Sequence, residues 1–209
     1  KLDKLTSVRD KDGVFEVGLV DPKIKTFPHD ETSDGLTVKG VRFWLDTGKN
    51  KFGNEADWSK MKVFHLTDES LESKSEGSVP SLDFVKGDIL TWLNDGDHKV
   101  QWSYPDLLDF GPGAPKFLEV EAWQKSGDWE ILKVRRTPGR KAPKKDESDP
   151  DEVFDGDALR ATVAVRYAKP YVILFTAPVV EDGYFGVPKE QTWKRIQDVA
   201  EKTLGSVRI

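Results

Sequence analysis

Hydrophobic and polar positions follow their most regular patterns in the last third of the chain. Every second residue is apolar from Leu159 to Tyr167, whereas Tyr171 to Ala177 is almost continuously apolar. The first pattern is typical of a strand with one covered face, and the second of a central strand covered on both faces. After Pro188, apolar residues recur at helical spacing as far as Gly205. The ending is therefore predicted to be two strands followed by an amphipathic helix.

The rest of the pattern predicts further strands, one more helix and several loops. Apolar residues spaced by three and four predict a helix from Ser81 to Leu93, with Ser81 as its N-cap. Alternation from Phe117 to Gln124, a turn at Lys125–Asp128 and a strand from Trp129 to Arg136 predict a hairpin. Strands are predicted at Val14–Leu19, at Leu36–Leu45 with a break at Gly40, at Lys60–Leu66 and at Val100–Tyr104, and loops at Phe27–Gly35 and Gly111–Pro115.

These elements predict an α+β fold. Antiparallel strands that end in a packed helix indicate an antiparallel β-sheet sandwich with helices on its faces, here as a single domain over residues 1–209. Residues 137–157 form a loop that is basic in its first half and acidic in its second. Loops of this length in a compact domain usually carry a function or are disordered.

Composition removes several classes of function. The net charge of −5 and the pI near 5.4 argue against a nucleic-acid binder that relies on a basic face. The absence of cysteine excludes disulfides and thiolate metal sites. No apolar stretch approaches the roughly 20 residues that a membrane-spanning helix needs. Because the chain begins at Lys1 rather than Met, either a targeting segment has been removed or the first residues are missing, and of the two we expect removal.

Three pieces of the C-terminal part carry a resemblance to a known family. They are the strand Trp129–Thr137 that leads into the charged loop, the strand pair Leu159–Val165 and Tyr171–Ala177, and the closing helix from Gln191 to Ala200 with the ending Gly205-Ser206-Val207-Arg208-Ile209. In this order they resemble the PsbP family, the extrinsic lumenal proteins of photosystem II and their PsbP-like relatives. The resemblance is loose before Phe117.

The resemblance implies a PsbP/Mog1-like fold and a non-catalytic peripheral subunit, without a cofactor, in the chloroplast thylakoid lumen. Its partners would be a membrane-embedded photosystem core and neighbouring extrinsic subunits. The photosystem II member helps retain calcium and chloride for oxygen evolution without supplying ligands. Three alternatives stay open: a subunit or assembly factor of photosystem I or another thylakoid complex, a β-rich structural or carbohydrate-binding module with a Trp-lined face, and an enzyme, which only unassigned carboxylates support.

The predicted partner-docking residues are cations. Six of them lie between residues 135 and 145, and others lie in a basic arm at residues 1–12. They could dock on an acidic protein surface, and salt would weaken that binding. The alternative for the loop is a solvated segment without a partner. The predicted residues are Lys1, Lys4, Arg9, Arg135, Arg136, Arg140, Lys141, Lys144 and Lys145.

No metal site is predicted. The three histidines, His29, His65 and His98, are far apart, and none has a partner at the spacing of a zinc site. His29-Asp30-Glu31 and Asp95 with Asp97-His98 could hold a divalent ion, but we interpret each of them as a solvated turn. His65 lies in an apolar strand and is expected to be half-buried. Asp151–Asp157 lacks the ligands that a calcium loop needs at its third and last positions.

Overall fold

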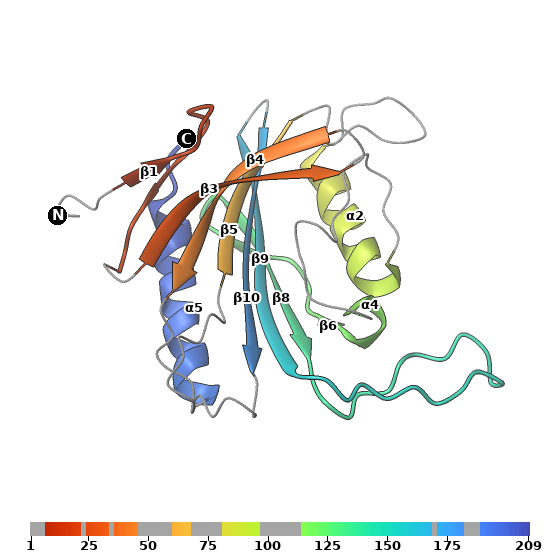
Figure 1. The fold of residues 1–209 in the computed structure, drawn as a ribbon. Coiled ribbons are helices and arrows are strands. Elements are labelled where there is room, and N and C mark those ends of the chain that lie inside the picture. Colours follow the sequence, from red (N-terminus) through yellow and green to blue (C-terminus); the bar gives the residue numbers. More distant parts are fainter. Residues whose placement is uncertain are drawn as a thin grey trace.

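The computed structural model describes residues 7–21, 24–33, 36–45, 60–67, 81–96, 114–168, 171–181 and 189–209. In this part of the chain the protein is a mixed α/β structure with an antiparallel β-sheet and two long helices (Figure 1). The elements are β1 (Ser7–Arg9), β2 (Glu16–Gly18), β3 (Ile24–Ser33), β4 (Leu36–Leu45), β5 (Lys60–Leu66), α2 (Leu82–Asp95), α4 (Ala114–Phe117), β6 (Glu119–Val120), β7 (Gln124–Ser126), β8 (Trp129–Arg136), β9 (Ala158–Ala168), β10 (Tyr171–Glu181) and α5 (Lys189–Ser206).

Eight of these strands form one sheet. Its order is β3-β4-β5-β10-β9-β8-β6, and β7 also pairs with β8. Every pairing in the sheet is antiparallel. β10 lies in the middle, paired with β9 along its whole length and with β5 on its other side. Its residues Val172 to Ala177 are buried, which confirms the prediction of a central strand covered on both faces.

Helix α2 covers one face of the sheet. The Ser81 hydroxyl accepts a hydrogen bond from the Phe84 N–H (3.2 Å), so the predicted helix and its N-cap are confirmed. Gly96 ends the helix with a left-handed φ of 77°, and its N–H donates to the Trp92 carbonyl. The apolar side of the helix packs on alternate residues of the strands, among them Phe64, Leu132, Val163 and Leu174.

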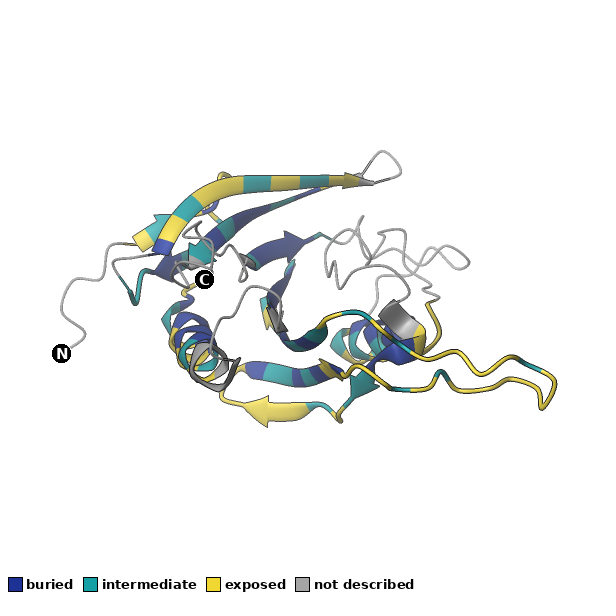
Figure 2. Cartoon of the chain, turned by 60° about the horizontal axis from the view of Figure 1, so that its bottom comes forward, coloured by how far each residue is buried: buried dark blue, intermediate teal, exposed yellow. Residues whose placement is uncertain are grey.

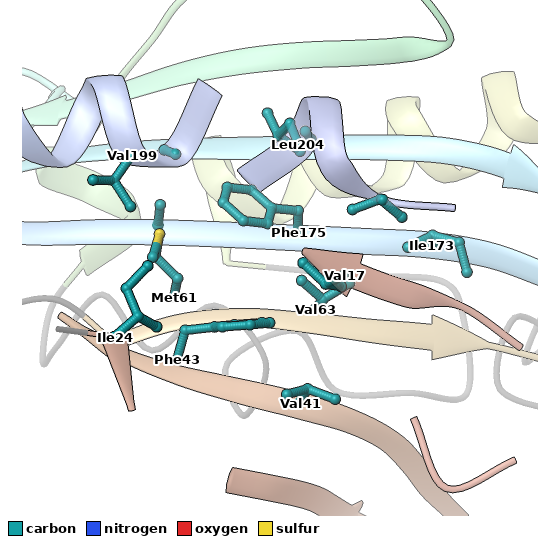
Figure 3. Packing of buried hydrophobic residues seen from close by; sticks show 14 of the residues in the cluster. Val17, Ile24, Val41, Phe43, Met61, Val63, Ile173, Phe175, Val199 and Leu204 are labelled. Atoms are coloured by element: carbon teal, nitrogen blue, oxygen red, sulfur yellow. The ribbon is translucent and has the colours of Figure 1, made fainter. Parts of the chain in front are cut away.

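Helix α5 and the N-terminal hairpin, Ser7–Gly18, cover the opposite face. In Figure 3, Val199 and Leu204 of α5 lie over Phe175 of β10, and Phe43 and Met61 of the neighbouring strands complete the same apolar cluster. Figure 1 shows α5 and α2 on opposite sides of the sheet. The fold is therefore a helix–sheet–helix arrangement in which the N-terminal hairpin adds to the α5 layer.

The N-terminal hairpin is hydrogen-bonded to the segment that follows α5. Glu16 and Arg208 exchange two main-chain hydrogen bonds of 2.8 Å each. The Ser206 hydroxyl accepts from the Gly18 N–H (3.1 Å) and lies 3.2 Å from the Gly18 carbonyl. The α5 layer of the fold is therefore joined by hydrogen bonds between segments that are 188 residues apart in sequence.

β3 corrects the prediction of a loop at Phe27–Gly35. Residues Ile24 to Ser33 form an edge strand paired with β4 along its whole length. Pro28 is compatible with this position because an edge strand leaves one side of its backbone unpaired. The exposed face is rich in polar residues, which is why the pattern was typical of a loop.

The predicted break at Gly40 is also wrong. β4 runs through Gly40 without interruption, and the Phe64 ring lies directly against the Gly40 backbone. A Cβ at this position would overlap the ring and the Val63 carbonyl oxygen. The glycine is therefore required by a close approach between neighbouring strands rather than by a bend.

The segment before β8 is less regular than predicted. The predicted strand Phe117–Gln124 is divided into β6, three residues without regular structure and the start of β7. Ala114–Phe117 forms the short helix α4, so the end of the predicted Gly111–Pro115 loop is helical. The predicted strand Val100–Tyr104 lies outside the described residues.

Candidate functional site

The charged loop, residues 137–157, is a ribbon of two hydrogen-bonded limbs. We call it the charged ribbon. It extends beyond the ends of β8 and β9 and is largely exposed (Figures 1 and 2). Lys141 and Val153 form a β-bridge. Main-chain hydrogen bonds of 2.8 to 2.9 Å join Gly139 to Phe154, Phe154 to Arg140, and Ala142 to Glu152.

Arg136 anchors the base of the charged ribbon. Its residue surface is only 6% exposed, and its guanidinium carbon lies 4.5 Å from the centroid of the Phe154 ring. Phe154 in turn packs against Phe117 at a ring distance of 5.3 Å. Burial lowers the pKa of Arg136, and the charge of Asp157 opposes that shift. This predicted docking cation therefore contacts the protein's own ribbon rather than solvent.

Two further predicted cations share the carboxylate of Glu119. Arg140 pairs with Glu119 at 2.6 Å, and its second terminal nitrogen lies 3.5 Å from the Leu118 carbonyl oxygen. Arg135 approaches the other oxygen of Glu119 at 3.8 Å. The base of the ribbon is thus tied to β6 by charge as well as by aromatic packing.

The charged ribbon as a whole is acidic. Lys144 and Lys141 both lie near Asp151, at 3.0 Å and 3.8 Å. The Lys145 side chain is exposed. Residues 137–157 contain four Lys or Arg and seven Asp or Glu, a net charge of −3. The structure brings the predicted cations together with their own counter-charges, so a partner that contacts the whole ribbon meets a mixed, acidic surface.

The structure describes one of the three predicted N-terminal docking residues, Arg9. Lys1 and Lys4 lie outside the described residues. Arg9 is exposed in β1 and lies 3.5 Å from Glu16 of β2. The described half of the predicted arm at residues 1–12 therefore belongs to the N-terminal hairpin.

His65 is buried in contact with two carboxylates of that hairpin. It is 4% exposed, and the expectation of a half-buried histidine is wrong. Its Nδ1 lies 3.2 Å from Asp10 Oδ2, and its Nε2 lies 3.4 Å from Asp12 Oδ2. The Nδ1 contact lacks hydrogen-bond geometry. The rings of Phe15 and Tyr171 approach the imidazole edge-on.

Asp10 also organises the turn of the hairpin. Its side chain is fully buried, and its two oxygens accept hydrogen bonds from the Phe15 N–H (2.9 Å) and the Asp12 N–H (3.2 Å). Outside this turn, Lys39 donates a hydrogen bond of 2.9 Å to Asp12. That bond lowers the pKa of Asp12 and raises the pKa of Lys39. No sequence pattern indicates this cluster, because Asp10 and Asp12 are far along the chain from Lys39 and His65.

Two of the other candidate metal ligands, His29 and Glu31, already have a cationic neighbour. His29 Nε2 and Lys62 Nζ both lie 2.8 Å from Glu31 Oε1. The Lys62 ammonium already neutralises this carboxylate and would repel a divalent cation. Within the described residues there is no group of three or more side chains suited to holding a metal, and His98 lies outside them.

The four tryptophans whose side chains the structure describes offer no exposed binding face. Trp92 and Trp129 are buried, and Trp44 and Trp123 are half-buried. The Trp129 indole donates to the Leu204 carbonyl of α5 (3.2 Å), and the Trp123 indole to a carbonyl of α2. Trp92 belongs to the apolar cluster beneath α2, and the Arg42 guanidinium carbon lies 5.0 Å from the centroid of the Trp44 ring. All four side chains are therefore part of the fold.

Among the described residues, no helix is long and apolar enough to cross a membrane. Comparison of the sequence with models of known protein families and with curated proteins found no match.

Proposed function

We propose that the protein is a non-catalytic docking subunit of the PsbP-like kind, held on a photosynthetic complex in the thylakoid lumen. The observation that carries the proposal is the ending of the chain. Strands β9 and β10 and helix α5 carry the resemblance, and the charged ribbon enters the sheet through β9. If the complex is photosystem II, the subunit helps to retain calcium and chloride without binding them itself.

The charged ribbon supports a docking role by its position and its chemistry. It extends away from the sheet, and its base is held by Arg136 and Phe154. The exposed side chains of Lys145, Asp146 and Glu147 lie at its tip. Charges that are presented on an anchored segment steer association and set its salt dependence.

Two pairs of charge-removing substitutions at the tip test which sign the partner recognises. Lys144→Gln with Lys145→Gln removes the cations, and Asp146→Asn with Glu147→Gln removes the anions. Both leave the anchors at the base unchanged. If the tip docks electrostatically, the two double variants change affinity for the complex in opposite directions, and both differences shrink as salt rises. Lys202→Gln on α5 is a matched control, because among the described residues Lys202 pairs with Asp198 on the same exposed helix surface.

The membrane experiment uses thylakoids from which extrinsic proteins have been removed. The purified protein is added back, and photosystem II and photosystem I particles are then separated and probed for it. Retention that is lost in a high-salt wash supports the proposal, and the particle that retains the protein identifies the complex. Absence from both particles, or binding that a high-salt wash does not remove, contradicts it.

A further inference from the structure

A groove runs between helix α5 and the edge of the sheet formed by β7, β8 and β9. It consists of two hollows, of about 280 Å³ and about 470 Å³, which meet at the Lys133 side chain. Their combined size is in the range of pockets that bind small molecules. Neither hollow involves the charged ribbon or the N-terminal hairpin.

The strand pattern explains why Lys133 lies in this groove. On β8, Trp129 and Ile131 belong to the apolar cluster beneath α5, and Lys133 and Arg135 continue the same alternation. Lys133 therefore stands where the face would otherwise remain apolar. The pairing of β8 with β9 places Arg160 opposite Arg135, so both arginines lie at the same end of the groove.

Lys133 is a half-buried cation whose nearest described partner is neutral. Its ammonium donates to the Thr162 hydroxyl at 2.9 Å, and no described carboxylate lies within ion-pair distance. Burial lowers the pKa of Lys133, whereas the more distant charges of Glu201 and Glu121 oppose that shift. A partly desolvated ammonium of this kind would gain a strong charge-assisted hydrogen bond from an oxyanion that entered the groove.

The two hollows differ in chemistry. The smaller one is lined by charged and polar side chains, Lys133, Arg135, Arg160 and Gln197, together with Glu121. The larger one has apolar walls from both sides of the groove, Trp129 and Ile131 from β8 and Ala200 and Leu204 from α5. Polar residues, among them Gln124, Ser126, Thr162 and Glu201, also line it. The groove thus has a smaller, cation-rich end and a larger end in which apolar walls are combined with polar groups.

We propose that this groove binds a small amphipathic oxyanion, with a carboxylate or phosphate group at Lys133 and an apolar body between α5 and β8. Arg135 and Arg160 would add charge around the head group, and Thr162 would keep the ammonium in place. Such a ligand would bind in addition to any protein partner, because the groove and the charged ribbon share no residues.

Calorimetric titration of the purified full chain tests the proposal with four probes: octanoate, octyl phosphate, 1-octanol and inorganic phosphate. Octanoate and octyl phosphate have both parts of the ligand, and the other two have one part each. We expect binding of at least one of the two amphipathic anions, at least about ten-fold tighter than either single-part probe. Whichever of the two binds more tightly identifies the head group.

Substitutions locate the site. Lys133→Gln should weaken binding of the preferred anion by about ten-fold or more, the equivalent of one hydrogen bond to a charged group. Arg135→Gln should weaken it less, and Lys202→Gln, on the same helix layer but outside the groove, should leave it unchanged. Far-ultraviolet circular dichroism checks that each variant is folded.

Several results would overturn the proposal. They are the absence of binding by either amphipathic anion at millimolar concentration, equal binding of octanol and octanoate, and equal affinity of wild type and Lys133→Gln. If Lys133→Gln does not fold, the pH dependence of the wild type decides. Anion affinity that falls as alkaline pH removes the Lys133 proton supports the proposal, and affinity that is constant over that range overturns it. Since no membrane is present, these outcomes are independent of docking to a photosynthetic complex.

Discussion

The buried contact between Asp10 and His65 can be tested by a double-mutant cycle. The single variants are Asp10→Ala and His65→Leu, and the third variant combines them. Asp10→Asn serves as a milder control because an amide keeps one acceptor oxygen for the Phe15 N–H. The cycle separates the contact with the imidazole from the role of Asp10 in the turn.

The magnitudes follow from the bonds that each substitution removes. Asp10→Ala leaves the Phe15 and Asp12 N–H groups without their acceptor, and the first of these is buried. Each loss costs about 1 to 2 kcal/mol, so the variant should lose about 2 to 4 kcal/mol of unfolding free energy. Asp10→Asn should lose about half of that. The coupling between Asp10 and His65, at 3.2 Å, should be about 1 to 2 kcal/mol.

The assay is urea denaturation of the full chain near neutral pH, followed by far-ultraviolet circular dichroism. Equal slopes against denaturant for all four proteins are required before their free energies are compared. Additivity of the two single substitutions within about 0.5 kcal/mol would refute the reasoning, because the contact would then contribute nothing measurable. If Asp10→Ala lowers the free energy of unfolding by less than about 0.5 kcal/mol, the role assigned to Asp10 in the turn is also refuted.

Three further predictions address the sheet, the groove and the ribbon. Gly40→Ala should lower the free energy of unfolding by about 1 to 3 kcal/mol, because the Phe64 ring must move, and an unchanged urea midpoint would contradict the close approach. Lys133→Met should raise stability at neutral pH, where the wild type carries the desolvation cost of a half-buried ammonium. Between the lowered pKa of Lys133 in the folded state and the ordinary lysine pKa, the unfolded wild type binds more protons than the folded one, so wild-type stability rises with pH. The stability gain of Lys133→Met should therefore shrink across this alkaline range. A gain that stays constant there in urea melts would contradict the lowered pKa of Lys133. Phe154→Ala should accelerate trypsin cleavage in residues 136–145, since it removes the ring beneath the Arg136 guanidinium, and an unchanged cleavage rate would argue against this anchor.

The sequence was most informative where one face of an element is buried along its whole length. β9, β10 and α2 follow this rule, and their periodicity gave both their type and their approximate bounds. β3 does not follow it. It is an edge strand whose outer side meets solvent, so polar residues and Pro28 are compatible with it and its pattern is that of a loop.

The candidate sites depend on contacts between distant segments, which periodicity does not report. The charge of residues 137–157 was visible in the sequence, but not the pairing of Arg140 with Glu119 or the burial of Arg136. The strand pattern of residues 129–136 does not set Lys133 apart from the other polar residues of β8. The chemistry of Lys133 arises only because α5 lies across that face of the sheet.

The hydrogen bonds of Glu16 and Gly18 to the segment after α5 also set an order of events. On a ribosome or during passage through a membrane, the N-terminal hairpin emerges long before Ser206 and Arg208, which lie about 190 residues later. Until they arrive, β2 has an open edge on which a chaperone or another chain can pair. Completion of this layer therefore belongs to the last stage of biogenesis, and a chain that stalls before α5 would expose its first strands.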